Sequence, residues 1–262
     1  MFDTDCISSD STITSLVRSF YLNKTRPKYQ PFKWSLSLVL DVLRRPPFEP
    51  MATIPMANLT VKTTFLVALA SGSRRSELHA ITHYGSSLAP DKSAFDFRID
   101  PDFLSKTDHR RAVKERLITI PALPDDDPVE RTLCPVRSLL FYLDRTKTIR
   151  EETGGRKLFV SYKEKFKGDI SAQTISRWIK KAVKLSYEAA HHDGPTLQLH
   201  QIRAHEVRAF SASLANLGDI AIETILRAAS WKSHNTFTSF YLRDLTSESQ
   251  GLLKLGPLVA SR

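Results

Sequence analysis

The most informative stretch of the sequence runs from His205 to Tyr241 and reads HEVRAFSASL at residues 205–214 and AASWKSHNTFTSFY at residues 228–241. His205 and Arg208 are three positions apart, so on a helix they share one face. The spacing therefore predicts a helix that points one imidazole and one guanidinium in the same direction. The apolar residues expected to face the core from this helix are Val207, Phe210, Leu214 and Leu217.

The residues after this helix predict two more short helices. Gly218 is suited to end the helix that carries His205 and Arg208, and Asp219 is suited to cap the helix that follows it. The chain then turns at Ser230 and Trp231. The helix after Asp219 is expected to be anchored to the core by Ile222, Ile225 and Leu226. A last helix, opened by Ser233 or Asn235, is expected to carry Phe237, Phe240 and Tyr241.

The order H-x-x-R, then Trp231, then Tyr241 resembles the catalytic box of the tyrosine recombinases, the phage-integrase-like site-specific DNA recombinases. The run WKSHNTFTSFYLRD at residues 231–244 is most similar to recombinases of eukaryotic mobile elements, the DIRS-like and Crypton-like groups. The resemblance covers about residues 50–245. It implies the tyrosine recombinase catalytic-domain fold, which is mainly α with a small three-stranded antiparallel sheet.

The resemblance also implies two catalytic parts upstream. One is an arginine in a Gly-x-Arg-x-Ser-Glu-Leu context, which Arg74 supplies in GSRRSEL at residues 72–78. The other is a lysine on a small β-hairpin, and Lys106 in FLSKT at residues 103–107 stands where that hairpin is expected. Glu77, one helical turn after Arg74, is expected to orient an arginine or a histidine rather than to act as an acid.

The implied chemistry is attack of Tyr241 on a phosphodiester, which leaves a 3′-phosphotyrosine intermediate. A phenol has a reference pKa of about 10, so roughly one molecule in a thousand is ionised at pH 7, a deficit of about 4 kcal/mol. Arg74 and Arg208 are expected to grip the non-bridging oxygens with charge-assisted hydrogen bonds and to stabilise the charge of the transition state.

The remaining site residues are expected to handle protons. His205 can accept the phenol proton or bond the phosphate, and Lys106 can protonate the departing sugar oxygen. Trp231 stands where many members of the family have a second histidine, and its indole N–H can donate to a phosphate oxygen. This scheme uses no metal ion and no nucleotide cofactor.

Other interpretations stay open from the sequence. His200 and Arg203 form a second H-x-x-R, although the run AFSASL after Arg208 favours the later pair. Taken singly, each arginine is an ordinary candidate for a surface ion pair, and Tyr241 for a packing tyrosine. The same fold without catalysis would be a domesticated module for DNA binding or assembly. A type IB topoisomerase shares the tyrosine chemistry.

Composition limits the class of protein. The chain has 262 residues, 41% of them hydrophobic, which is enough to bury a core. Lys and Arg total 38 against 28 Asp and Glu, and the net charge of +10 favours a polyanion such as nucleic acid. Cys6 and Cys134 are far apart and no signal-peptide pattern begins the chain, so we expect an intracellular protein without a zinc site. No apolar run approaches the roughly 18 to 20 residues of a membrane helix, and no glycine-rich phosphate loop indicates nucleotide use.

The apolar patterns upstream predict mostly helices. Three strands are expected at residues 95–99, 103–106 and 117–120, with Lys106 at the second turn of the sheet, and a short strand at residues 158–160. The expected helices cover residues 13–20, 34–43, 59–70 with Asn58 as cap, and 134–153, and one more begins after Ser171.

The helix after Ser171 has one apolar and one basic face. Its core-facing residues are expected to be Ile175, Trp178, Ile179, Ala182 and Val183. Its basic face is formed by Arg177, Lys180, Lys181 and Lys184, which we assign to DNA contact, with a solvated surface as the alternative.

We expect two parts of the chain. Residues 1–49 form a short helical segment, a remnant or truncated form of the DNA-clamping domain that tyrosine recombinases carry, and residues 50–262 form the catalytic domain with a C-terminal tail. The expected partner is double-stranded DNA, on which the monomer assembles into dimers and tetramers. The leucines after Tyr241 are expected to dock on a neighbouring protomer or to fold back. The expected location is intracellular, and nuclear if the chain comes from a eukaryotic mobile element.

Overall fold

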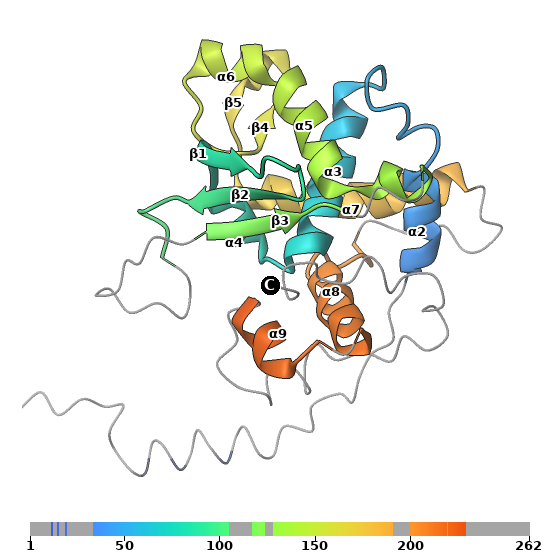
Figure 1. The fold of residues 1–262 in the computed structure, drawn as a ribbon, viewed down its shortest axis with the longest axis vertical. Helices are drawn as coiled ribbons and strands as arrows, with labels where there is room; N and C mark the ends of the chain where they lie inside the picture. Colours follow the sequence, from blue (N-terminus) through green and yellow to red (C-terminus); the bar gives the residue numbers. More distant parts are fainter. Residues whose placement is uncertain are drawn as a thin grey trace, which may run out of the picture. The chain divides into compact units, whose positions relative to one another are not determined.

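The computed structural model describes residues 34–104, 117–123, 128–190, 200–218 and 220–228, together with the isolated positions 12, 15 and 19. The chain divides into two compact units, Met1–Phe32 and Lys33–Arg262. Every helix and strand given below belongs to the second unit (Figure 1). The helix expected at residues 13–20 lies outside the described residues, apart from positions 15 and 19.

Helix α2 (Leu36–Leu43) belongs to the same compact unit as the rest of the described elements, although it precedes residue 50. It begins at Ser35, whose hydroxyl accepts a hydrogen bond from the amide of Leu38 at 3.3 Å. Its apolar residues are buried as the sequence predicted, and it packs against helix α7 (Ala172–Ala189).

Helix α3 (Met56–Ser71) is the centre of the unit. It packs against α5 (Pro135–Arg145), α7 and α8 (Glu206–Leu217), as Figure 1 shows for α5 and α8. All its residues from 59 to 71 are buried, because neighbouring elements surround it. The middle of this helix therefore cannot be recognised by an amphipathic pattern.

The ends of α3 bear on two sequence predictions. The assignment of Asn58 as its cap was wrong, because α3 begins at Met56 and the side-chain amide Nδ2 of Asn58 instead donates to the carbonyl of Pro47 at 3.0 Å. The predicted end is confirmed. Gly72 follows the helix in the left-handed conformation, with φ of 58°, which a glycine adopts without strain.

The sheet has three antiparallel strands in the order β1 (Ile81–Leu88), β2 (Ala94–Ile99) and β3 (Leu117–Pro121). This confirms the predicted sheet and two of its three strands. The prediction of a strand at 103–106 was wrong at residues 103 and 104, which are in no strand. The third strand of the sheet is β1 instead. Lys106 lies outside the described residues, in the segment of sequence that connects β2 to β3.

Strand β1 contains several polar residues, so the alternation of apolar residues did not predict it. Its pairing with β2 is irregular between Thr82 and Ser87, and Gly85 within this interval has φ of 69°. The inner positions of β2 are regular, since Phe95, Phe97 and Ile99 are all buried as expected.

The segment after the sheet forms a small helical and hairpin region. The helix expected at 134–153 is two helices, α5 and α6 (Lys147–Thr153), which are separated at Thr146. The 3-10 turn η2 (Glu130–Leu133) precedes α5, and η3 (Glu164–Phe166) connects β4 (Val160–Ser161) to β5 (Gly168–Asp169), which pair antiparallel. The expected strand at 158–160 is thus confirmed only at its last residue.

The last described helices follow the predicted pattern. The hydroxyl of Ser171 accepts from the amide of Thr174 at 3.2 Å and begins α7, whose predicted apolar face is buried. Helix α8 ends at Gly218, and α9 (Ile222–Ala228) packs through Ile225 against Ala212 and Ala215 of α8. Asp219, Trp231, Tyr241 and the leucines of the tail lie outside the described residues.

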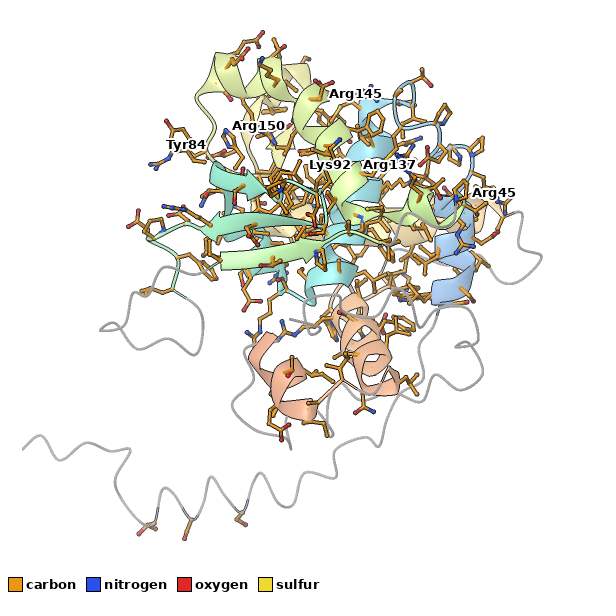
Figure 2. The ribbon with its side chains drawn as sticks, in the orientation of Figure 1. Arg45, Tyr84, Lys92, Arg137, Arg145 and Arg150 are labelled. Carbon is orange, nitrogen blue, oxygen red and sulfur yellow. The ribbon has the colours of Figure 1, made fainter. Side chains whose placement is uncertain are left out.

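A charged cluster is buried beside α3. The ammonium of Lys62, which is 0% exposed, donates to Glu49 Oε1 at 2.6 Å and to the carbonyl of Leu43 at 2.7 Å. Arg137 of α5 donates to the same Glu49 oxygen at 3.0 Å and points toward this segment (Figure 2). Burial alone would raise the pKa of Glu49, but the hydrogen bonds and charges of Lys62 and Arg137 hold it below its usual value. The cluster fixes the segment between α2 and α3.

Among the helices of the described residues, none has the length and apolar character needed to cross a membrane.

Candidate active site

The site begins where α3 ends and α4 (Arg75–Ala80) starts. Arg74 occupies the N-cap position of α4, and Glu77 is the third residue of that helix. The amide of Arg74 donates to Glu77 Oε2 at 2.6 Å, and its guanidinium Nη1 donates to Glu77 Oε1 at 2.9 Å. One buried carboxylate therefore holds both the backbone and the side chain of Arg74, and the expectation that Glu77 lies one turn after Arg74 agrees with this geometry.

Arg208 reaches the same carboxylate from α8. Its side chain is 3% exposed, and Nη1 donates to the carbonyl of Gly72 at 2.7 Å. The same nitrogen is 3.4 Å from Glu77 Oε2. Two arginines that are far apart in sequence are thus brought together by Glu77 and by the carbonyl at the end of α3.

The first turn of α8 is fixed by a contact that the sequence argument missed. Glu206 Oε2 accepts from the indole Nε1 of Trp34 at 2.8 Å and from the amide of Arg203 at 3.3 Å. The Trp34 ring also packs on Phe210, with centroids 4.7 Å apart. Glu206 thereby holds the turn that carries His205. An acidic residue in the first helical turn is a recognisable signal, but its partner Trp34 is not.

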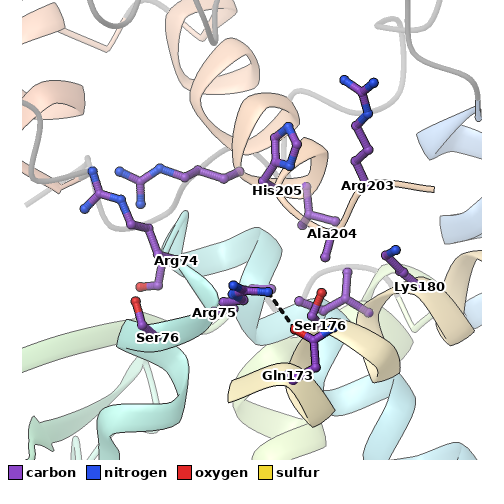
Figure 3. A pocket seen from close by; sticks show the side chains of 14 residues that line it. Arg74, Arg75, Ser76, Gln173, Ser176, Lys180, Arg203, Ala204 and His205 are labelled. Atoms are coloured by element: carbon purple, nitrogen blue, oxygen red, sulfur yellow. Dashed lines mark hydrogen bonds between the residues drawn. The ribbon is translucent and has the colours of Figure 1, made fainter. Parts of the chain in front are cut away.

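Arg74, His205 and Arg208 border a pocket of about 500 Å³. Figure 3 shows Arg74 and Lys180 on opposite sides of it, with His205, the N-cap residue of α8, between them. Arg75 and Gln173, which had no predicted role, also line the pocket, as does Arg203 of the alternative H-x-x-R pair. Arg75 Nη1 donates to Gln173 Oε1 at 2.7 Å, which connects α4 to α7.

The basic face of α7 is divided among three environments. Lys180 lines the pocket beside Arg74, His205 and Arg208. Arg177 and Lys181 line a second pocket on the other flank of the helix. Lys184 pairs with Glu188 at 3.0 Å. Of the four residues assigned to DNA contact, the structure thus places one in the candidate site.

The alternative H-x-x-R pair has a different geometry. His200 is exposed in a turn and does not line the pocket, whereas Arg203 is an exposed residue at its edge. His205 and Arg208 both line the pocket, and Arg208 is the residue that is bonded to Glu77. The structure therefore brings together Arg74, Glu77, His205, Arg208 and Lys180, while Lys106, Trp231 and Tyr241 lie outside the described residues.

The charge of the pocket favours an anion. Within the described part of the chain, five cationic side chains line it and no carboxylate does: Arg74, Arg75, Lys180, Arg203 and Arg208. Planar guanidiniums bind tetrahedral oxyanions such as phosphate through pairs of N–H donors. The described residues contain no group of three or more His, Cys, Asp or Glu side chains that could hold a metal ion.

The sequence matches no protein-family model, and no curated protein matches it. Several solved structures are nevertheless similar to this chain. The XerH site-specific recombinase bound to difH substrate, in a pre-cleavage complex, is similar with a TM-score of 0.52 and 13% identity, over 84% of this chain and 52% of that one. XerA recombinase has a TM-score of 0.49 and 17% identity, over 87% of this chain and 65% of that one.

A lambda integrase(75-356) dimer bound to a COC′ core site has a TM-score of 0.43 and 19% identity, over 89% of this chain and 71% of that one. The chain spans about half the length of the XerH recombinase, at 52%. The similarity to XerH extends over most of the chain, and the helices with their small three-stranded sheet agree with it. The protein has the catalytic-domain fold of the tyrosine recombinases.

Proposed function

We propose that this protein is a site-specific DNA recombinase or integrase of a mobile element, which cleaves and rejoins DNA through a 3′-phosphotyrosine. The observation that carries the proposal is the joint placement of Arg74 and Arg208 on Glu77, at a pocket that His205 and Lys180 also line. Such a pair of guanidiniums supports binding of one phosphodiester group by two of its oxygens.

Burial explains why this pair is suited to phosphoryl transfer. Glu77 and the Gly72 carbonyl hold Arg208 before any substrate arrives, so its orientation needs no reorganisation at the transition state. Arg74 is 29% exposed and remains accessible from the pocket. His205 and Lys180 add two groups that can donate to phosphate oxygens.

The remaining roles are proposed from the sequence. Tyr241 is the nucleophile, Lys106 the acid for the leaving sugar oxygen, and Trp231 a donor to the phosphate. The proposed partner is double-stranded DNA, with assembly into dimers and tetramers on it. The leucines after Tyr241 are proposed as the connector between protomers. The proposed location is intracellular, in the nucleus if the element is eukaryotic, and the affinity to DIRS-like and Crypton-like elements is part of the same proposal.

The test is covalent capture from a pool of nicked duplexes with randomised sequence. A nick beside the scissile phosphate lets the short cleaved strand diffuse away, so the phosphotyrosine adduct accumulates and survives denaturation. We expect the wild-type protein to form an adduct that mass spectrometry maps to Tyr241, and sequencing of the trapped DNA to reveal a preferred site. Tyr241→Phe should bind the same DNA but form no adduct, because only the nucleophilic oxygen is removed.

Three results would contradict the proposal. An adduct that maps to Tyr162 or Tyr187 would reject Tyr241 as the nucleophile. Sequence-specific binding without any adduct would favour the idle DNA-binding module with the same fold. Loss of the adduct in EDTA would contradict a scheme in which no metal ion takes part.

A further inference from the structure

A second pocket, of about 670 Å³, lies on the flank of α7 opposite the candidate active site. It is formed by the β4 to β5 hairpin with its η3 turn and by the first turns of α7. Its aromatic residues are Tyr162, Phe166 and Trp178, and its cationic residues are Lys163, Arg177 and Lys181. Nothing in the proposed cleavage reaction requires this pocket.

The aromatic side chains are arranged as a partly open surface. The rings of Tyr162 and Trp178 lie close to parallel, with centroids 6.1 Å apart and an angle of 26° between their planes. Trp178 is buried beneath, but Phe166 is 73% exposed. Exposure of a whole phenyl ring is unfavourable in water, so a ligand that covers the Phe166 ring would gain free energy from burying it.

The cationic side chains are available to a ligand. Lys163, Arg177 and Lys181 form no ion pair with any residue that the structure describes, in contrast to Lys184 further along α7, which pairs with Glu188. The pocket contains one carboxylate among the described residues, Asp169, so its charge is positive. An anionic ligand is therefore favoured.

The exposed Phe166 ring and cations that form no ion pair within the described residues together favour one ligand chemistry. An acidic peptide would use the cations but offers a ring to Phe166 only where it carries an aromatic residue, and a regular duplex presents phosphates but keeps its base faces covered. Unpaired nucleotides offer both a phosphate for each cation and a base for the ring. We propose that this pocket binds unpaired nucleotides of a nucleic-acid strand, with the phosphates on Arg177 and Lys181 and a base on Phe166.

Helix α7 connects the new site to the first pocket. Ser176 and Lys180 line the candidate active site, and their neighbours Arg177 and Lys181 line this one. An α-helix with its side chains is about 10 to 12 Å across, so a strand of a few nucleotides can reach from one pocket to the other. The inference goes beyond the proposed function, since binding here does not depend on cleavage.

The test measures binding of fluorescent probes to the full chain by anisotropy. The probes are oligothymidine and oligouridine of about 12 nucleotides, which is within the range that single-strand sites cover, a blunt duplex, and the same duplex with a short unpaired bulge. Phe166→Ala should weaken binding of oligothymidine about tenfold and leave the blunt duplex unchanged. Tyr84→Ala, which removes another exposed ring of 68% exposure outside the pocket, should change neither.

Salt dependence separates the cations from the ring. The double variant Arg177→Ala, Lys181→Ala should reduce the slope of log affinity against log salt by about 1.4 for oligothymidine, because two phosphate contacts are lost. Phe166→Ala should leave that slope unchanged. A preference for oligouridine would identify RNA as the source of the unpaired nucleotides, and equal binding of the bulged duplex would identify distorted DNA; each supports the site.

Other outcomes overturn it. If Phe166→Ala binds oligothymidine as tightly as the wild type, or weakens the blunt duplex equally, no base stacks on Phe166. If a polyglutamate peptide displaces oligothymidine at equal concentration, the pocket is a site for acidic protein segments. Tyr241→Phe should bind every probe normally, so failure of the cleavage test leaves this inference intact, and its own failure leaves the cleavage proposal intact.

Discussion

Two carboxylates in this protein, the buried Glu77 and the largely covered Glu49, each hold two cations, yet the clusters around them differ in kind. Glu49 accepts hydrogen bonds from Lys62 and Arg137, and Glu77 accepts them from Arg74 and Arg208. In both clusters a backbone carbonyl accepts from the more buried cation, at Leu43 for Lys62 and at Gly72 for Arg208. A shared carboxylate is therefore not by itself a sign of function.

The difference lies in what surrounds the cations. Lys62 is fully buried, and carbonyl oxygens and Glu49 surround its ammonium group, so the cluster is complete within the fold. Arg74 and Arg208 instead line a pocket whose other charged residues are also cationic. The Glu49 cluster holds a loop in place, whereas the Glu77 cluster holds two arginines that line a pocket, of which Arg74 is 29% exposed.

The largest expected effect tests the structural role of Glu49. Glu49→Ala should lower the free energy of unfolding by about 3–5 kcal/mol, because it leaves the buried ammonium of Lys62 without a carboxylate. Urea denaturation measures this loss. Glu151→Ala, which breaks an exposed pair with Lys147 of 3.9 Å, is the control and should have no measurable effect. A loss below about 1 kcal/mol for Glu49→Ala would reject the buried cluster as a fixed point of the fold.

The second prediction uses two arginines that are matched in exposure. Arg74 is 29% exposed and Arg137 is 28% exposed; Arg74 donates to Glu77 at 2.9 Å and Arg137 donates to Glu49 at 3.0 Å. Arg74→Ala should reduce the rate of adduct formation by about 10²–10³-fold, since a donor to the transition state is lost, while Arg137→Ala leaves it within about twofold. Single-turnover assays on the captured DNA measure both rates. Equal losses would mean that the effect is one of charge or stability, common to both clusters.

The smallest expected effect is the pH dependence that comes from Lys62. Burial lowers the pKa of Lys62 to about 8 from an ordinary 10.5, and the bond and charge of Glu49 oppose only part of that shift. Between these two values the unfolded chain binds more protons than the folded one, so stability should increase with pH. Burial raises the pKa of Tyr142 to about 12, so the folded state keeps that proton longer and stability should fall above pH 10.

The useful window is therefore between about pH 8 and pH 10, where Lys62 should contribute about 2–3 kcal/mol to the rise. Urea denaturation across this window measures the rise in the wild type, and Lys62→Met should lack it. If both proteins have the same slope, the buried ammonium does not titrate in this range.

The sequence contained enough local signals to predict most of the helices. Gly72 and Ser171 are end signals that depend on a few neighbouring residues, and both act in the structure as predicted. The relation of Arg74 to Glu77 is likewise local, since the two are three residues apart. The alternating apolar segments and the resemblance to a known family both predicted the three-stranded sheet, and the resemblance also grouped Arg74, His205 and Arg208, which line one pocket.

Contacts between distant segments could not be read in the same way. The partners of Glu49 lie on two other helices, and no pattern near Glu49 indicates Lys62 or Arg137. Strand β1 was missed because Gly85 and its polar neighbours interrupt the alternation of apolar residues. The division of the basic face of α7 into separate pockets depends on which elements pack beside it. Sequence periodicity indicates only which side chains share the basic face of α7, and not which pocket each of them lines.

The bond between Trp34 and Glu206 has a consequence for the order of events during synthesis. Its two ends are 172 residues apart, and at about 5–20 residues per second a ribosome needs on the order of 10 to 30 s to make the chain between them. Phe65 is made soon after Trp34 and can pack on its ring within a few seconds, whereas Glu206 and Phe210 are made much later than both. The Trp34 ring is therefore covered only by Phe65 until α8 has left the ribosome. Chaperones that recognise exposed aromatic surface can bind it during that interval.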